Sequence, residues 1–383
     1  MSSTTNLQVD LLALEANLVG IRELVGDRAI LVAVKANAYG HGAVEISRFL
    51  EDAQLADSLG VANVGEAAEL RKAGVSLPIL CFSPCLPEQL PAAIQQHMEL
   101  TVVDSQTILD AQEAASGLDA QVNVHLAVDT GMRRIGCSPA EAVQLAELIA
   151  ECPALVLKGI STHLPESDDL AGYEFTEGEL TSFRDVVDAV SNMLLTRGIT
   201  PPSQIHASNS GGILGHTLDG LTMVRPGIMA YGYYPDVETP HSIELRQIAS
   251  LTTRVTFLKQ IPAGDTVGYG RSWTAPTDRW IATVGAGYGD GYSRLLSNRG
   301  RVLIGGHSYP IAGRVCMDQC MIDLGETNPG VSVGDSVTLI GRDGDEFIPT
   351  EEVADLMGTI TYEVLCLISP RVGRSYSCGA VQA

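Results

Sequence analysis

The feature that most constrains the fold is a regular alternation of two kinds of segment between residue 29 and about residue 235. Short apolar runs rich in β-branched residues are separated by amphipathic stretches with helical spacing, such as residues 65–74 and 138–150. About eight such β/α units in roughly 200 residues predict an α/β fold, with an N-terminal (β/α)8 TIM-type barrel. A doubly wound open sheet is the alternative, but no GxGxxG sequence follows the first expected strand. The expected strands are residues 29–34, 60–64, 78–82, 100–104, 122–128, 155–162, 204–207 and 221–224.

The pattern changes after Pro240. Residues 248–345 carry short alternating runs with frequent glycine, which predict a mainly antiparallel β domain, and residues 350–358 predict one helix. We therefore expect a barrel domain over residues 1–243, with its first residues as candidates for the β domain, and a C-terminal β domain over residues 244–383. The acidic stretch 165–180 is interpreted as a solvated loop that leads into a helix.

Composition narrows the function. The chain has 383 residues with 24 Lys plus Arg against 46 Asp plus Glu, a formal net charge of −22 that disfavours binding to nucleic acid or an anionic membrane. The N-terminal sequence MSSTTNLQVDLL lacks the basic start and apolar run of a signal peptide, so we expect a cytoplasmic protein. The eight cysteines form no CxxC pair and have no zinc-site spacing, so they are expected to be buried and reduced, with no metal bound.

Polar groups follow several of the expected strands. In an α/β barrel the reactive groups collect just beyond the C-terminal ends of the strands, around one mouth. Five separate strand ends carry groups that suit an anionic cofactor with a carbonyl group. These are Lys35, residues 129–134, His163, residues 209–210 and Arg225.

The same segments carry a family resemblance. The run AVKANAYGHG (33–42) resembles the segment of bacterial alanine racemases that attaches pyridoxal 5′-phosphate, and further matches follow in order along nearly the whole chain. They are VDTGMRRIG (128–136), STH (161–163), HASNS (206–210), MVRPGIMAYG (223–232), VGYGRSW (267–273), GYGDGY (287–292), GRVCMDQCMIDLG (313–325) and TYEVLCLISPRVGR (361–374).

The resemblance implies a set of cofactor-binding residues. Lys35 would form the Schiff base with pyridoxal phosphate, which requires an amine able to lose its proton. Arg225 would face the pyridine nitrogen, supported from behind by His206. Because a guanidinium keeps its proton, that nitrogen should remain an acceptor. The other implied contacts are Tyr39, Asn209, Ser210, Gly227 and Ile228 with the phosphate region and His163 with the ring.

The resemblance also implies a two-base mechanism in a homodimer. Lys35 would exchange the proton on one face of the substrate Cα. Tyr269, supplied by the second subunit, would exchange the proton on the other face. Arg134, Met317 and Tyr288 would contact the substrate, with Asp318 behind them. The implied activity is interconversion of L-alanine and D-alanine, which supplies D-alanine for peptidoglycan.

Two positions depart from the family pattern and keep alternatives open. Ala127 stands where many members have a carbamylated lysine beside the arginine, and Pro370 stands where a tyrosine is usual. These departures leave open a broader racemase that also accepts serine. A pyridoxal-phosphate carrier built on the barrel alone lacks the second domain and Tyr269, and a related decarboxylase would carry a cysteine motif that is not found around Cys316 or Cys366.

Overall fold

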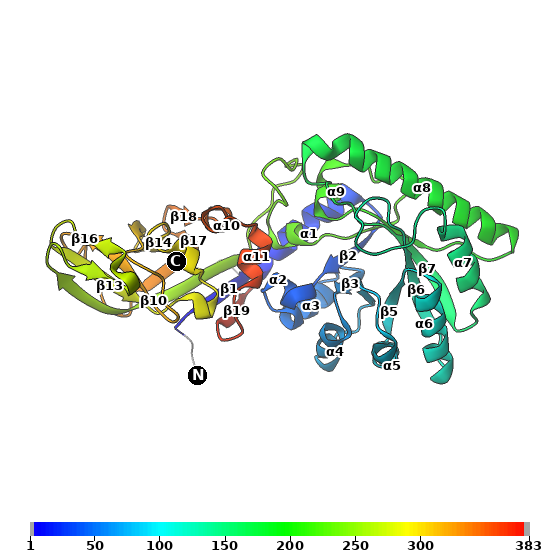
Figure 1. The fold of residues 1–383 in the computed structure, drawn as a ribbon, viewed down its shortest axis with the longest axis horizontal. Helices are drawn as coiled ribbons and strands as arrows, with labels where there is room; N and C mark the ends of the chain where they lie inside the picture. The colour runs from blue at the N-terminus through cyan, green and yellow to red at the C-terminus, as the bar shows by residue number, and fades with distance from the viewer. Residues whose placement is uncertain (1–3, 379–383) are drawn as a thin grey trace. The chain divides into compact units, whose positions relative to one another are not determined.

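A computed structural model describes residues 4–378, which fold as two units (Figure 1). The barrel unit comprises residues 14–38 and 43–246. The β unit comprises residues 4–13, 39–42 and 247–378. Each unit is built around its own main sheet.

The barrel unit contains an eight-stranded parallel sheet with the order β8-β7-β6-β5-β4-β3-β2-β9. Two backbone hydrogen bonds join its ends, from Thr222 N to Ile205 O (3.0 Å) and from Arg225 N to Ser208 O (2.9 Å). The predicted barrel is thereby confirmed, and the open sheet is excluded. The strands read as continuous apolar runs because helices cover their outer face. They are β2 (Ala29–Ala33), β3 (Ser58–Val61), β4 (Ile79–Cys81), β5 (Met98–Val102), β6 (Val122–Ala127), β7 (Leu155–Ser161), β8 (Gln204–His206) and β9 (Met223–Val224).

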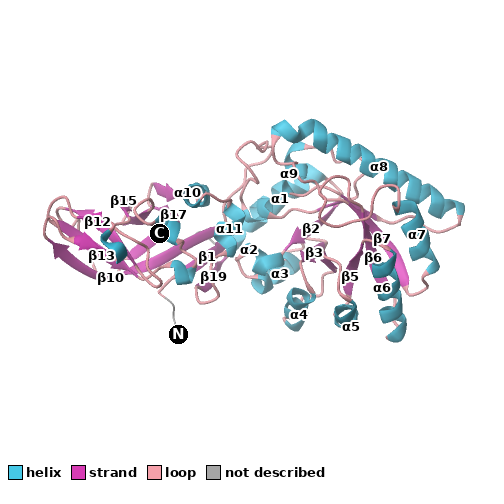
Figure 2. Ribbon diagram, viewed as in Figure 1, coloured by secondary structure: helices cyan, strands magenta, loops and turns pink. Residues whose placement is uncertain are grey.

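Helices lie outside the strands of this unit, as Figure 2 shows. Local chemistry sets where several of them begin: the Asn63 side chain accepts a hydrogen bond from Glu66 N, and Asp104 and Thr107 form a reciprocal capping box. The helices are α1 (Leu11–Val25), which begins in the β unit, α2 (Lys35–Tyr39), α3 (Ala43–Asp52), α4 (Val64–Lys72), α5 (Leu90–Gln95), α6 (Ser105–Gly117), α7 (Ala142–Glu151), α8 (Tyr173–Thr196) and α9 (Ser210–Gly215).

The β unit is built on a nine-stranded, mainly antiparallel sheet, as predicted. Its first strand, β1 (Asn6–Asp10), pairs antiparallel with β10 and parallel with the last strand, β19. The other strands are β10 (Ala249–Ile261), β13 (Arg279–Val284), β14 (Arg301–Ile304), β15 (His307–Pro310), β16 (Cys320–Gly325), β17 (Ser336–Asp343), β18 (Glu346–Ile348) and β19 (Gly373–Ser377), with a separate pair, β11 (Thr266–Val267) and β12 (Trp273–Thr274). Two helices complete it, α10 (Thr350–Met357) and α11 (Thr361–Cys366).

Short 3-10 helices connect these elements. They are η1 (Pro87–Gln89), η2 (Leu170–Gly172), η3 (Ile228–Tyr231), η4 (Tyr269–Arg271), η5 (Tyr288–Asp290) and η6 (Arg294–Leu296). Within residues 4–378, no helix combines the length and apolar character that crossing a membrane requires.

Two expectations need correction. The acidic stretch 165–180 leads into a helix as expected, since α8 begins at Tyr173, but it is not solvated throughout, because Glu179 is only 4% exposed. The cysteines are free thiols, but they are not uniformly buried, because Cys366 and Cys378 are exposed and Cys85 and Cys316 are partly so. In both cases the expectation was drawn from the type of residue, whereas the exposure of each side chain depends on how the chain packs.

Candidate functional site

Lys35 follows strand β2 and begins a turn of unusual backbone geometry. The next four residues all have positive φ: 51° at Ala36, 56° at Asn37, 51° at Ala38 and 52° at Tyr39. Left-handed backbone is costly for residues with a Cβ, so the surroundings must hold it. Glu66 accepts a hydrogen bond from Ala36 N (2.9 Å), and the Asn37 side chain accepts one from Ala43 N (2.8 Å). The Lys35 ammonium nitrogen lies 5.8 Å from the centroid of the Phe82 ring.

This turn gives the first prediction. Replacing Ala36 with glycine is expected to increase the free energy of unfolding by up to about 1 kcal/mol, because glycine adopts positive φ without a Cβ clash. The matched control, Ala68→Gly within helix α4, should instead lose about 0.5–1 kcal/mol. Urea denaturation of both variants measures the difference. Equal destabilisation by the two substitutions would show that residue 36 is not left-handed in solution.

Arg225 follows strand β9, which pairs with the strand that precedes Lys35. Its guanidinium is buried and donates from Nη1 to His206 Nδ1 and His206 O (both 2.8 Å), and from Nη2 to Thr162 O (2.8 Å) and Ala207 O (2.9 Å). Nη2 also lies 3.3 Å from His163 Nδ1. Burial and then the charge of Arg134 lower the Arg225 pKa to about 10, so it remains a cation at neutral pH.

The side chain of His163 lies near three positive charges at this end of the barrel. Its pKa is lowered to about 3, first by burial and then by the charges of Arg225, Arg134 and Lys35. His163 is therefore neutral at physiological pH. Three cations gathered around a neutral imidazole form a site that suits an anionic ligand.

Ser210 and the segment after β9 form a second group. The buried Ser210 Oγ accepts hydrogen bonds from Gly227 N (3.0 Å) and Met229 N (3.3 Å). Asn209 caps helix α9: its Oδ1 accepts from Gly212 N (3.0 Å) and from Ser167 Oγ (2.7 Å). Among the hydrogen bonds described for residues 4–378, none uses the Ile228 N–H or the Nε–H of Arg225. Two donors thus remain for a ligand at this end of the barrel.

The DTGM loop after β6 carries Arg134. Asp129 Oδ1 accepts from the backbone N–H groups of Gly131 and Arg133 (both 3.0 Å), which folds the loop back on itself. Ala127 is buried beside it, and its carbonyl accepts from Cys137 N (3.0 Å). Arg134 itself is exposed, and no ion pair of the described residues involves it.

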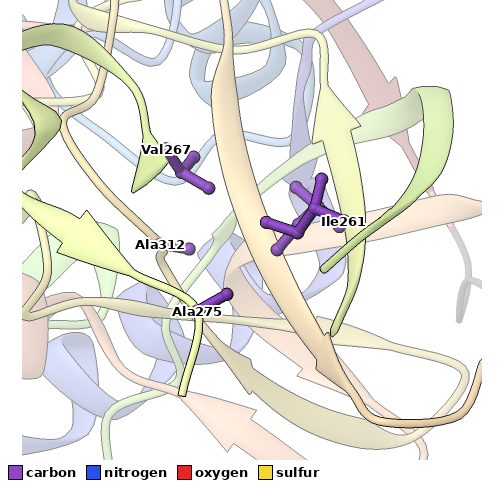
Figure 3. Packing of buried hydrophobic residues seen from close by; sticks show 5 residues of the cluster. Ile261, Val267, Ala275 and Ala312 are labelled. Carbon is purple, nitrogen blue, oxygen red and sulfur yellow. The ribbon is translucent and has the colours of Figure 1, made fainter. Parts of the chain in front are cut away.

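Tyr269 lies in the β unit and is 72% exposed. It lies in a turn flanked by Gly268 (φ 74°) and Gly270 (φ 71°), and strands β11 and β12 pair on either side. The base of the turn is anchored in a small hydrophobic core, shown in Figure 3. The buried members of that core are Ile261, Val267, Ala275, Ile281 and Ala312. The phenol of Tyr269 is therefore exposed, on a turn that is packed against this core.

Tyr288 and Met317 lie together elsewhere in the β unit. Tyr288 N donates to Cys316 O (3.0 Å) and Gly289 N to Met317 O (2.8 Å), and both side chains are exposed. Arg371 holds this pair of turns in place, because its guanidinium contacts Asp290 Oδ1 and Asp318 Oδ1 (both 2.8 Å). Asp318 therefore acts here as a partner of Arg371.

Tyr39 and Pro370 also belong to the β unit. Tyr39 is buried, its ring lies 5.9 Å from the Tyr362 ring, and burial raises the pKa of its phenol far above the ordinary value. Pro370 is exposed in a turn closed by a hydrogen bond from Val372 N to Ser369 O (3.1 Å). Proline at the second position is compatible with such a turn.

The structure thus gathers Lys35, Arg134, His163 and Arg225 at one end of the barrel, with His206 behind Arg225, and holds Tyr288, Met317 and Asp318 together in the β unit. Sequence reasoning missed the residues that support these groups. No sequence motif marks these supporting residues. They are Glu66, which accepts a hydrogen bond from the Lys35 turn, Arg371, and the buried carboxylates Glu99 and Glu179. The described residues contain no group of three or more His, Cys, Asp or Glu side chains that could hold a metal ion.

Both parts of the chain match a known protein family. Residues 9–235 match the family described as alanine racemase, N-terminal domain, and residues 248–376 match alanine racemase, C-terminal domain. The chain is 47% identical over 374 residues to an alanine racemase from Cutibacterium acnes and 42% identical over 365 residues to one from Chlorobaculum tepidum. The matched regions cover 97% of both chains in the first pair, and 94% of this chain and 92% of the relative in the second.

Solved structures agree as well. An alanine racemase from Clostridium difficile 630 superposes with a TM-score of 0.90 at 35% identity, covering 100% of this chain and 98% of that one. An alanine racemase from E. faecalis gives 0.89 at 35% identity, with 98% of each chain covered. Nearly the whole chain is thus matched, and the chain belongs to the alanine racemase family of isomerases.

Proposed function

We propose that the protein is a pyridoxal-phosphate-dependent alanine racemase that interconverts L-alanine and D-alanine with two bases. The observation that carries the proposal is that Lys35 and Arg225 follow neighbouring strands, β2 and β9, and lie with Arg134 around the neutral His163. The relatives are named alanine racemases, so a broader alanine and serine racemase is not favoured.

The residues present fit pyridoxal phosphate. The amine of Lys35 would hold the cofactor covalently, and the unused N–H groups of Arg225 and Ile228 would donate to it, together with Ser210 and Gly227 near the phosphate. Asn209 would support Ser210 by capping the same helix, and Tyr39 would donate to the phosphate. When bound, the cofactor withdraws electrons from the substrate and makes its Cα proton more acidic.

The chain's own groups then handle the proton. Lys35 would exchange it on one face of Cα and Tyr269 on the other, because one base cannot easily serve both faces. Arg134 would bind the substrate carboxylate, and Tyr288 and Met317 would close a pocket suited to a methyl side chain. Since Tyr269 is exposed on its own chain, we propose a homodimer in which the second subunit supplies it.

The proposed setting is the cytoplasm, with D-alanine destined for cell-wall peptidoglycan. Purified protein supplied with pyridoxal phosphate should convert L-alanine into D-alanine, detected with a D-amino-acid oxidase. Borohydride reduction and peptide mapping should place the fixed cofactor on Lys35, which is one of only four lysines in the chain. Fixation on Lys72, Lys158 or Lys259 instead, or turnover of other amino acids but not alanine, would overturn the proposal.

A further inference from the structure

A continuous row of hydrogen bonds runs through the interior of the barrel unit and ends on Arg225. Lys158 on β7 contacts Glu99 Oε1 on β5, and Glu99 Oε2 lies 2.9 Å from His125 Nε2 on β6. His125 Nδ1 lies 2.8 Å from His206 Nε2 on β8, and His206 Nδ1 lies 2.8 Å from Arg225 Nη1. We call these five residues the buried row.

The row is built into the packing of the barrel. The His125 side chain is fully buried, and Glu99, His206 and Arg225 are each less than a tenth exposed. Gly159 on β7 leaves space for the imidazole: a Cβ at that position would lie only 2.3 Å from His125 Nδ1. A polar row of this depth is costly unless each donor meets an acceptor.

The Arg225 end allows only one direction for the hydrogen bonds. A guanidinium has donors and no acceptor, so His206 Nδ1 must present a lone pair and carry its proton on Nε2. His206 Nε2–H then donates to His125 Nδ1, which leaves the proton of His125 on Nε2, pointing at Glu99. Both histidines are thereby neutral Nε2–H tautomers.

The opposite end requires the same direction. An ionised carboxylate is an acceptor only, so Glu99 accepts from both His125 and Lys158. Burial alone would raise the Glu99 pKa, but the hydrogen bonds from His125 and Lys158 and the positive charge of Lys158 outweigh it and hold that pKa below its ordinary value. Burial and then the charge of Arg225 lower the His206 pKa well below its ordinary value, which keeps His206 neutral. Both ends of the row thus require the same hydrogen-bond direction, and each donor in the row faces an acceptor.

We propose that Glu99, paired with Lys158, is a positioning residue that fixes both histidines as Nε2–H tautomers and so keeps the Nδ1 lone pair of His206 on Arg225. The expected effect on cofactor binding and racemisation rests on the function proposed above. The assignment of the tautomers does not depend on that function. Glu99 acts through His125, His206 and Arg225 and touches no reacting atom.

The substitution Glu99→Gln tests the direction of the row. Lys158 is a donor only and would take the glutamine oxygen, which turns the amide NH2 towards His125 Nε2. His125 must then carry its proton on Nδ1, and His206 must do the same. The Nδ1–H of His206 would face the Nη1–H of Arg225, so that two donors oppose each other.

Nitrogen-15 NMR of the full-length protein with labelled histidine reads the tautomers directly, because protonated and unprotonated ring nitrogens differ in chemical shift. We expect His125 and His206 to be Nε2–H in the wild type and Nδ1–H in Glu99→Gln, with or without added pyridoxal phosphate. Glu179→Gln makes the same change at another buried carboxyl of the barrel unit and should leave both rings unchanged. Either ring as Nδ1–H in the wild type overturns the proposal even if the variant fails to fold, and unchanged rings in a folded Glu99→Gln overturn it as well.

Kinetics of the holoenzyme give the second readout. Loss of one charge-assisted hydrogen bond at Arg225 should lower kcat for alanine about ten- to a hundredfold and weaken pyridoxal phosphate retention. The KM for alanine should change little, because Arg134 is not part of the row. A raised KM with unchanged kcat would contradict the positioning role. Absence of alanine turnover in the wild type would instead contradict the proposed function and leave the tautomer result standing.

Discussion

Replacement of Tyr269 by phenylalanine is expected to lower the rate of alanine racemisation about 10²- to 10⁴-fold while the protein keeps its pyridoxal phosphate. That range is the usual contribution of a positioned general acid or base. The hydroxyl is the only group removed, and the turn that carries it is anchored by the packing of Val267 beneath it. Exchange of the Cα proton with deuterated solvent should fall for one alanine enantiomer more than for the other, because Lys35 still serves its own face.

The matched control removes a hydroxyl from the same unit at a place outside the proposed site. Tyr309→Phe on strand β15 should leave turnover unchanged. If Tyr269→Phe retained full turnover in both directions, Tyr269 would not be the second base, and another group would have to act on that face.

Subunit mixing tests the proposed homodimer. Lys35→Ala and Tyr269→Phe should each be nearly inactive alone, but a heterodimer would contain one site with both substitutions and one intact site. Random mixing should therefore restore about a quarter of wild-type activity per subunit. If purified heterodimers stay inactive, Lys35 and Tyr269 of one site come from the same chain.

Ionisation of Glu179 is expected to lower the stability of the barrel unit as the pH rises from about 4.5 to 7, and Glu179→Gln should abolish this contribution. His163 and His206, whose pKa values are lowered, contribute in the opposite direction over the same window, so the effect is read as the difference between variant and wild type. The two carboxyl oxygens of Glu179 are buried and have no hydrogen-bond partner among the described residues. The backbone of the DTGM loop passes directly against them, since a Cβ on Gly131 would lie 2.0 Å from Oε1. Burial and then the charge of Asp129 raise the Glu179 pKa to about 7.

The sign follows from the proton count. Between pH 4.5 and 7 the folded chain holds a proton on Glu179 that the unfolded chain has released, so the Glu179 contribution to stability is lost as the pH rises through this window. At 1.36 kcal/mol per pKa unit, the cost at pH 8 approaches about 3 kcal/mol. Glutamine is neutral at every pH, and its amide can donate towards Asp129.

Urea denaturation at pH 5 and pH 8 measures the effect. Both tryptophans, Trp273 and Trp280, lie in the β unit, so far-ultraviolet circular dichroism is the better probe of the helix-rich barrel unit. Glu179→Gln should equal the wild type at pH 5 and exceed it at pH 8, whereas Glu174→Gln, an exposed position on the same helix, should change neither value. A constant difference between Glu179→Gln and wild type at both pH values would show that Glu179 is ionised throughout.

Much of the fold was predictable from sequence because several barrel strands, such as β3 and β5, are buried over their whole length and therefore read as largely apolar runs. The expected strand at 29–34 is β2 (Ala29–Ala33), and the expected helix at 350–358 is α10 (Thr350–Met357). The placement of Lys35 and Arg225 at the same end of the barrel was predictable for a second reason. Both residues follow strands, and the C-terminal ends of barrel strands converge.

The residues that support the site were not predictable. Glu99, His125 and His206 are separated by 26 and 81 positions, and no local pattern links them. Glu179 lies in an acidic stretch that is typical of an exposed loop, yet helix α8 buries it beside Gly131.

By itself, the sequence determined the strand and helix pattern, the order of the family's motifs and the residues at the strand ends, because these depend on neighbours along the chain. The left-handed turn after Lys35, the tautomers of the buried row and the protonation of Glu179 were decided only by the tertiary structure. Each is a costly local state: positive φ at alanine, a neutral histidine with one allowed proton position, or a buried carboxyl. Such states persist because partners distant in sequence, such as Glu66 for the turn and Asp129 for Glu179, leave no cheaper alternative.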